Sequence, residues 1–177
     1  MKVFLTGASG VMGRSSIEAL HQSGHSVVGL ARTSTSAELI AAAGAKPWRG
    51  DVYDGAALVA GMRGCDAVAN LATKVPVGTA ALRPGSLREV DRIRVVGSKV
   101  VAIAAREAGV PRIVQQSLSF IYAGAGDDWI DEQSPIDVTG ATEPVVVAEH
   151  RMARFAEFGG TSVSLRFGLI TGDDRNT

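Results

Sequence analysis

The N-terminal segment constrains the fold more than any other part of the chain. The apolar run Lys2–Thr6 is followed by glycines at three-residue spacing, Gly7, Gly10 and Gly13, and then by a helical pattern that reaches Gln22. A strand that breaks into glycines and resumes as a helix predicts a tight turn at the carboxyl end of the strand. The first amides of such a helix have no partner within it, so they and the helix dipole face an anion-binding position.

Each glycine of this turn meets a separate physical requirement. Gly7 allows the sharp exit from the strand, Gly10 lets a pyrophosphate approach the backbone, and Gly13 lets the helix lie close to the sheet. Because the turn follows an N-terminal strand and opens a helix, it predicts a dinucleotide-binding loop, with a glycine-rich turn without a ligand as the alternative. The predicted cofactor contacts of the loop are Gly7, Ser9, Gly10, Val11, Met12 and Gly13.

Length and charge exclude several classes of protein. A chain of 177 residues suits one well-packed domain, so we predict a single domain over 1–177. Lys plus Arg and Asp plus Glu both total 18, which leaves no net charge to attract nucleic acid or an anionic membrane. There is one cysteine, Cys65, no signal peptide or membrane span is recognisable, and no spacing of His or Cys residues indicates metal ligands. We therefore expect a cytoplasmic protein that binds neither nucleic acid, membrane nor metal.

Strand-like and helix-like segments alternate along the whole chain. This order predicts an α/β fold, a doubly wound, mainly parallel Rossmann-type sheet with helices on both faces. The acidic segment 120–144 is predicted to be irregular, and its Trp129 is expected to pack on a neighbouring part of the molecule. The predicted strands are Lys2–Thr6, His25–Ala31, Ala45–Arg49, Ala67–Leu71, Ile113–Ser117 and Ser162–Arg166, and the predicted helices are 11–22, Thr35–Ala43, Asp54–Met62, Ser86–Ala108 and Val145–Phe158.

The residue after the second predicted strand bears on the identity of the cofactor. In this fold that position meets the adenosine ribose, where an Asp or Glu binds a free 2′-hydroxyl and an Arg favours a 2′-phosphate. The sequence has Arg32 there, followed by Thr33 and Ser34. A guanidinium beside two hydroxyls suits a phosphate, so NADP is predicted, with NAD as the alternative. The reading without a ligand is that Arg32 is a solvated loop residue.

An ordered set of motifs then resembles one family. Thr6–Gly13 matches TGxxGxxG, and the other segments are Gly50–Val52, Asn70–Ala72, Ser117–Ala123 and Leu165–Gly172. In these segments the chain resembles extended short-chain dehydrogenases/reductases of the NAD(P)-dependent epimerase/dehydratase group. The resemblance implies further cofactor contacts, a small-molecule substrate, and a homodimer formed through the long helix and the helix from Val145. The implied contacts are Asp51 and Val52 by the adenine, and Leu71 and Ala72 along the cofactor.

Two departures from the family pattern concern catalysis and length. Enzymes of the group use a Tyr-xxx-Lys pair, in which the Lys ammonium lowers the pKa of the tyrosine. The aligned positions here carry Val145 and Glu149, which cannot do that work. The group also usually continues into a smaller substrate domain, so a C-terminal substrate domain is expected to be missing from this chain. The catalytic candidates that remain are Tyr122, Ser117 and Ser119, with packing beneath the cleft as the alternative for Tyr122.

Two functions follow from these observations. The first is an atypical NADP-dependent oxidoreductase that moves hydride to or from a carbonyl or hydroxyl carbon of a small molecule. The second is a non-catalytic NADP-binding sensor or regulator. The cofactor loop and the polar residues near Tyr122 favour the first, and Val145 and Glu149 favour the second.

Overall fold

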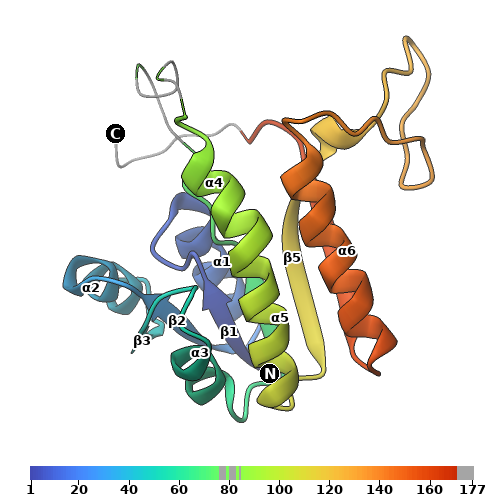
Figure 1. Cartoon of the computed structure of the whole chain (residues 1–177). Coiled ribbons are helices and arrows are strands. Elements are labelled where there is room, and N and C mark those ends of the chain that lie inside the picture. Colours follow the sequence, from blue (N-terminus) through green and yellow to red (C-terminus); the bar gives the residue numbers. More distant parts are fainter. Residues whose placement is uncertain (76–78, 80–82, 84, 171–177) are drawn as a thin grey trace.

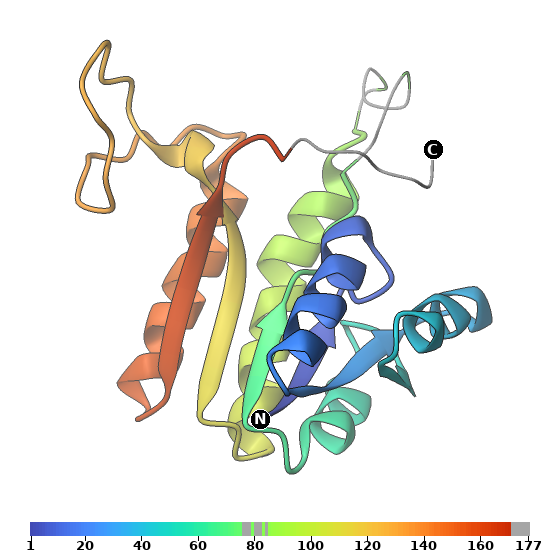
Figure 2. The same cartoon turned by 180° about the vertical axis from the view of Figure 1, so that it is seen from behind.

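The structure is a computed structural model that describes residues 1–75, 79, 83 and 85–170. Its strands form one sheet with the order β3-β2-β1-β4-β5-β6, and each strand runs parallel to its neighbours. This arrangement confirms the predicted doubly wound parallel sheet (Figures 1 and 2). The strands are β1 (Lys2–Thr6), β2 (Ser26–Ala31), β3 (Lys46–Arg49), β4 (Ala67–Asn70), β5 (Arg112–Leu118) and β6 (Thr161–Phe167).

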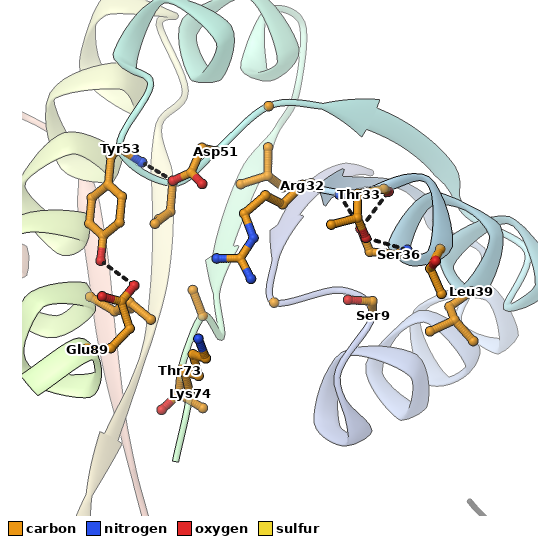
Figure 3. A pocket seen from close by; sticks show the side chains of 17 residues that line it. Ser9, Arg32, Thr33, Ser36, Leu39, Asp51, Tyr53, Thr73, Lys74 and Glu89 are labelled. Atoms are coloured by element: carbon orange, nitrogen blue, oxygen red, sulfur yellow. Dashed lines mark hydrogen bonds between the residues drawn. The ribbon is translucent and has the colours of Figure 1, made fainter. Parts of the chain in front are cut away.

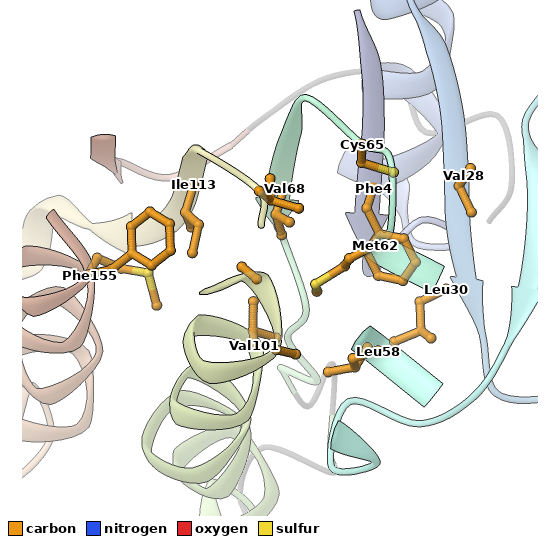
Figure 4. Packing of buried hydrophobic residues seen from close by; sticks show 14 residues of the cluster. Phe4, Val28, Leu30, Leu58, Met62, Cys65, Val68, Val101, Ile113 and Phe155 are labelled. Carbon is orange, nitrogen blue, oxygen red and sulfur yellow. The ribbon is translucent and has the colours of Figure 1, made fainter. Parts of the chain in front are cut away.

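Helices cover both faces of the sheet, because alternate residues of the central strand face opposite sides. Phe4 packs in a cluster with Leu58 of α3 (Gly55–Met62) and Val101 of α5 (Ser98–Glu107) (Figure 4). Its neighbour Leu5 packs with Ile17 of α1 (Val11–Gln22) and Ile40 of α2 (Ser34–Ala42) on the other side. The helices are α1 (Val11–Gln22), α2 (Ser34–Ala42), α3 (Gly55–Met62), α4 (Arg88–Arg92), α5 (Ser98–Glu107) and α6 (Glu143–Glu157), with a π-helical turn η2 (Ile93–Gly97) and a 3₁₀ turn η3 (Ser119–Ile121).

The strand order reverses between β1 and β4. Thr6 and Asn70, the last residues of these strands, lie opposite each other in the register. Ligands of open parallel sheets bind outside the carboxyl ends of the strands at such a reversal. The glycine turn follows β1 directly, so the fold places it at the expected position for a bound ligand.

Two helix predictions differ from the structure in detail. The helix expected over Ser86–Ala108 is three consecutive pieces, α4, η2 and α5, with a wider π-helical turn in the middle. The Ser98 hydroxyl donates a hydrogen bond to the Arg94 carbonyl there. The last helix begins at Glu143, before the predicted start at Val145, because a proline is tolerated in a first helical turn.

The segment between η3 and α6 projects away from the sheet (Figure 1). An isolated antiparallel bridge between Tyr122 and Ile136 closes its base, supported by a hydrogen bond from the Ala123 amide to the Pro135 carbonyl at 2.9 Å. Trp129 in this segment is 99% exposed. The prediction that Trp129 packs on a neighbouring part of the molecule is therefore wrong.

Some sequence predictions reach beyond the described residues. Thr171 and Gly172 of the last family-like segment lie outside them, as do 173–177 of the predicted domain and parts of the loop 72–85. Over the ranges that are described, no helix combines the length and the apolar character needed to cross a membrane.

Candidate functional site

The glycine turn has the close backbone packing that its sequence predicts. Gly7 has a φ of +67°, and a Cβ there would lie 2.5 Å from the Leu71 carbonyl oxygen. A Cβ on Gly13 would lie 2.2 Å from the Gly7 carbonyl oxygen. Gly10 differs, because a Cβ there would meet the Gly7 oxygen at 3.2 Å and otherwise project from an exposed position. The fold itself requires Gly7 and Gly13, whereas Gly10 keeps the space outside the turn open.

A cavity of about 380 Å³ lies beside this turn, at the carboxyl ends of β1 to β4 (Figure 3). Its volume falls within the range of small-molecule sites. Six of the predicted cofactor contacts line it, namely Gly7, Ser9, Arg32, Asp51, Val52 and Ala72. The other five lie around it. Gly10 and Val11 are exposed at the start of α1. Beneath the turn, Leu71 belongs to a buried apolar cluster, Met12 packs against that cluster, and Gly13 packs against the backbone of Gly7 and Ala8.

Arg32 extends from the end of β2 into the cavity (Figure 3). Next to it, α2 begins with a capping box, in which the Ser36 amide donates to Thr33 Oγ1 at 3.1 Å and the Thr33 amide donates to Ser36 Oγ at 2.9 Å. The positive end of the α2 dipole thus adjoins the guanidinium. Lys74, which sequence reasoning missed, lines the cavity as a second cation in the segment after β4.

The Asp51 and Tyr53 side chains form the wall of the cavity opposite α2. Asp51 Oδ1 accepts a hydrogen bond from the Tyr53 amide at 3.0 Å, and Tyr53 Oη donates to Glu89 Oε1 at 3.2 Å. Arg92 covers the Tyr53 ring, with Cζ 4.3 Å from its centre. Burial, and then the charge and hydrogen bond of Glu89, raise the pKa of Tyr53, so it keeps its proton at neutral pH. This contact joins the segment after β3 to α4.

Three buried polar side chains tie the strand ends together beneath the turn. Thr6 Oγ1 donates to Asn70 Oδ1, and Asn70 Nδ2 donates to Gln115 Oε1 at 2.7 Å. The Ala72 amide also donates to Thr6 Oγ1, at 3.3 Å. Each of the three side chains is at most 3% exposed. A satisfied network of this kind fixes the relative position of β1, β4 and β5, and with it the floor of the cavity.

A second cavity, of about 750 Å³, lies at the carboxyl ends of β5 and β6. The predicted catalytic candidates Ser119 and Tyr122 line it, together with Arg166. Ser117 is instead 2% exposed and donates a hydrogen bond to Glu149 Oε1, behind the cavity wall. The structure therefore brings Tyr122 and Ser119 to one surface and places Ser117 beneath it.

The two residues that the sequence analysis aligns with the family's Tyr-xxx-Lys pair have other contacts in the structure. Val145 is 2% exposed and packs against Ile121. Glu149 forms an ion pair with Arg166, whose Nε and Nη2 donate to Oε1 at 2.9 Å and Oε2 at 2.8 Å. Burial opposes the charge of Glu149, but the hydrogen bonds from Arg166 and Ser117 outweigh it and hold the pKa of this carboxyl below its usual value. Glu149 is thus a fixed anion.

Arg166 is a functional candidate that sequence reasoning missed. It belongs to the segment Leu165–Gly172 that resembles the family, which was the available signal, but a sequence does not show which residue an arginine pairs with. The hydrogen bonds to Glu149 raise the pKa of Arg166 above its usual value, and hydrogen bonding to Tyr122 raises it further. Burial lowers this pKa but is outweighed. In the described part of the chain, no three His, Cys, Asp or Glu side chains gather as metal ligands would.

The first cavity fits a dinucleotide. Gly10 has no side chain at the exposed start of α1, where a diphosphate would approach the helix amides. Arg32 and Lys74 supply positive charge, and Asp51 supplies a carboxylate. The two cations can bind phosphate groups, and the Asp51 carboxylate can accept hydrogen bonds from another part of the same ligand.

A family model matches most of the chain. The model of the NAD dependent epimerase/dehydratase family matches residues 3–156. This range includes the glycine turn and all of α6 except its last residue, Glu157.

Two curated relatives are reductases. The 4-hydroxy-2-methyl-3-oxo-4-farnesyl-3,4-dihydroquinoline-1-oxide ketoreductase of Stigmatella aurantiaca is 32% identical over 178 residues, which cover 98% of this chain and 52% of the relative. The 3-diazoavenalumate denitrifying reductase of a Streptomyces species is 29% identical over 188 residues, which cover 97% of this chain and 57% of the relative. The chain thus spans little more than half the length of these relatives.

Solved structures of similar fold contain NAD. A UDP-glucose-4-epimerase from Stenotrophomonas maltophila, with bound NAD and formylated UDP-arabinopyranose, superposes with a TM-score of 0.77 at 24% identity over 94% of this chain and 52% of its own. MoeE5 in complex with UDP-glucose and NAD superposes with a TM-score of 0.75 at 26% identity, over 94% of this chain and 54% of its own.

Proposed function

The chain belongs to the NAD-dependent epimerase/dehydratase family, and we propose that it binds NADP beside the glycine turn and acts as an oxidoreductase on a small carbonyl or hydroxyl compound. The observation that carries this proposal is the cavity at the strand reversal, which the glycine turn, Arg32 and Asp51 line together. The reductase names of the two relatives support the reaction class.

The chain's own residues have distinct roles toward the dinucleotide. The amides at the start of α1 would bind the diphosphate, approached across Gly10. Asp51 and Val52 would lie by the adenine, and Leu71 and Ala72 would lie along the path toward the nicotinamide. When bound, the nicotinamide exchanges a hydride with a carbon of the substrate.

NADP rather than NAD is proposed because of the end of β2. No carboxylate stands there, and Arg32 faces the cavity beside the N-terminus of α2. The solved neighbours contain NAD, so the 2′-phosphate is proposed for this chain from its own residues.

Arg32→Ala should weaken the binding of NADPH roughly 10- to 100-fold, because one charge-assisted contact is lost, and should weaken the binding of NADH far less. Titration calorimetry with both cofactors measures the ratio, and Arg49→Ala, an exposed arginine of β3, is the control. Equal weakening of both cofactors would refute the 2′-phosphate assignment.

Tyr122 is the proposed proton donor and acceptor for the substrate oxygen. It lines the second cavity together with Ser119, whose hydroxyl can bind the same oxygen. Ser117, which the sequence made a third candidate, supports the site from beneath by its hydrogen bond to Glu149.

The second candidate function is a cofactor-binding sensor without turnover. The observation in its favour is that the family's catalytic positions hold a buried Val145 and an ion-paired Glu149. The two functions differ in one assay, in which NADPH consumption is followed with a panel of aldehydes, ketones and quinones. Turnover that Tyr122→Phe abolishes while NADPH still binds supports the oxidoreductase. Saturable NADPH binding without turnover, unaffected by Tyr122→Phe, supports the sensor.

A cytoplasmic homodimer is part of the same proposal. Ile103 of α5 and Phe158 at the end of α6 are 39% and 61% exposed, and both line one groove between these helices. Exposed apolar side chains on a paired-helix face are typical of an interface between subunits.

A further inference from the structure

Polar contacts connect four side chains at the carboxyl ends of β5 and β6. Glu149 accepts two hydrogen bonds from Arg166, from Nε at 2.9 Å and from Nη2 at 2.8 Å, and a third from Ser117. The Arg166 guanidinium carbon also lies 4.9 Å from the centre of the Tyr122 ring. Arg166 therefore contacts both the carboxylate and the phenol.

We propose that Arg166 is the residue that positions the catalytic phenol of Tyr122, and that Glu149 and Ser117 act on Tyr122 through it. This inference rests on the proposed function, because it assumes that Tyr122 exchanges a proton with the substrate oxygen. In a Tyr-xxx-Lys pair, the cation comes from the next turn of the same helix. Here the cation is Arg166 of β6, and Glu149, which stands in α6 at the position aligned with the lysine, holds Arg166 in place.

The charges of the group fit this role. A lone carboxylate at position 149 would oppose negative charge developing on a nearby phenol oxygen. The two parallel hydrogen bonds from Arg166 compensate that charge, and the planar guanidinium fixes the geometry as an ammonium could not. A cation in a fixed orientation then lies over the Tyr122 ring, although the carboxylates of Asp131 and Glu132 also line this cavity.

The burial of the four side chains also separates their roles. Arg166 and Tyr122 line the 750 Å³ cavity, whereas Ser117 and Glu149 are not among its lining residues. The side chains of Arg166 and Glu149 are 23% and 12% exposed, so water screens their interaction only in part. Arg166 thus lies between the cavity on one side and the side chains of Ser117 and Glu149 on the other.

The proton step involves Tyr122 alone. In the reductive direction, Tyr122 Oη would give its proton to the substrate oxygen, while a bound reduced dinucleotide would supply hydride to the substrate carbon and become oxidised. The carbonyl would become a hydroxyl. The phenolate would then take up one proton from the solvent, so each turnover would consume one proton and restore the phenol. A hydroxyl held at a fixed position shortens the path of this proton.

A spectroscopic experiment tests the coupling without a substrate. The chain contains two tyrosines, so 3-fluorotyrosine labelling gives two ¹⁹F signals, and Tyr53→Phe assigns the one from Tyr122. The variants are Arg166→Gln, Arg166→Lys and Glu149→Gln. The control is Arg112→Gln, at the exposed amino end of β5. We expect Glu149→Gln to move the Tyr122 signal in the same direction as Arg166→Gln, and Arg112→Gln to leave it unchanged. An unmoved Tyr122 signal in folded Arg166→Gln or Glu149→Gln protein overturns the proposal.

A kinetic experiment tests the consequence for catalysis. Arg166→Gln should lower kcat by roughly 100-fold or more, within the range of acid–base contributions, while the Kd of NADPH stays within about twofold. Arg166→Lys should have a higher kcat than Arg166→Gln and a lower one than the wild type, because lysine keeps the positive charge but cannot form the two parallel hydrogen bonds to Glu149. Undiminished kcat in Arg166→Gln overturns the proposal. If Arg166→Gln does not fold, Arg166→Lys and Glu149→Gln give the same comparison.

Different results would contradict the proposed function and the role of Arg166. A wild-type chain that binds no dinucleotide, or turns over no carbonyl compound, contradicts the proposed function. The ¹⁹F comparison still decides whether Glu149 and Arg166 control Tyr122.

Discussion

At the scale of single residues, the ion pair of Glu149 and Arg166 links stability to pH. The folded-state pKa of Glu149 is lowered from its usual value of 4.5, so its charge stabilises the folded protein above that value. The contribution is lost as the pH falls from 4.5 through the lower folded-state value. Glu149→Gln should therefore cost about 1–3 kcal/mol near pH 7 and flatten the loss of stability below pH 4.5.

Urea denaturation at a series of pH values measures this effect. Glu157→Gln is the matched control, because Glu157 is an exposed residue at the end of the same helix. It should change the free energy of unfolding by less than about 0.5 kcal/mol. A Glu149→Gln protein that keeps wild-type stability at pH 7 and the wild-type acid response would contradict the role of the pair.

Residue by residue, local chemistry was predictable and long-range pairing was not. The spacing of Gly7, Gly10 and Gly13 predicts a turn whose backbone leaves no room for a side chain at Gly7 and Gly13. Arg32 follows a strand end, so its position follows from the fold. Glu149 and Arg166 are 17 residues apart on different elements, and nothing local in either segment indicates that they form a pair.

At the scale of elements, the approach of α3 to the sheet depends on a residue without a side chain. A Cβ on Gly61 would lie 2.6 Å from Phe4 Cε2 and 2.7 Å from Trp48 Nε1. The Trp48 indole also donates to the Ala57 carbonyl of α3 at 2.9 Å, so it has little freedom to move aside. Gly61→Val should destabilise the protein by about 1–3 kcal/mol through overpacking.

Ala60→Val is the control, because Ala60 is the exposed neighbour on the same helix. It should cost only about 0.5 kcal/mol, the difference in helix propensity between alanine and valine. Valine has a higher helix propensity than glycine, so a larger loss in Gly61→Val, measured by chemical denaturation, comes from overpacking. Equal losses in the two variants would show that α3 is free to shift away from β1.

The elements were predicted in type and order, and the misses have physical causes. All six strands were predicted, but only β1 and β2 from continuous apolar runs, which are typical of strands buried on both faces of a parallel sheet. The edge strands β3 and β6 are partly exposed and followed from the alternation of strands and helices along the chain. The π-helical turn η2 was missed, because it adds one residue to a turn of the helix and the sequence remains apolar on the same face on both sides of it. Trp129 was expected to pack, but its segment projects away from the sheet and leaves the ring exposed.

At the scale of the whole molecule, the proposed dimer has a predictable dependence on salt. The groove between α5 and α6 has an apolar floor and four cations, Lys99, Arg106, Arg151 and Arg154. A two-fold interface through this groove brings two such clusters together, and their repulsion weakens as salt screens it. Analytical ultracentrifugation should show a dimer that tightens between low and high ionic strength, and Arg154→Gln should reduce the difference. A monomer under all conditions, or a dimer that dissociates with salt, would contradict the proposed interface.

In the proposed function, the two cavities would serve one reaction. Both lie at the carboxyl edge of the sheet, one at β1 to β4 and one at β5 and β6. The buried contacts of Thr6, Asn70 and Gln115 fix the strand ends between them. In the proposed function, a dinucleotide bound at the glycine turn would extend along this edge toward Tyr122.

The most direct test of the account is calorimetric titration of NADPH into the wild-type chain and into Gly10→Ala. A methyl group at Gly10 meets only the Gly7 carbonyl oxygen, at 3.2 Å, so the melting temperature should stay nearly unchanged. The methyl group would stand where the diphosphate approaches the amides of α1. We predict saturable one-to-one binding to the wild type and an affinity at least roughly 10-fold lower in Gly10→Ala, equivalent to about 1.4 kcal/mol. Absence of binding to the wild type, or equal affinity in the two proteins, would contradict the account.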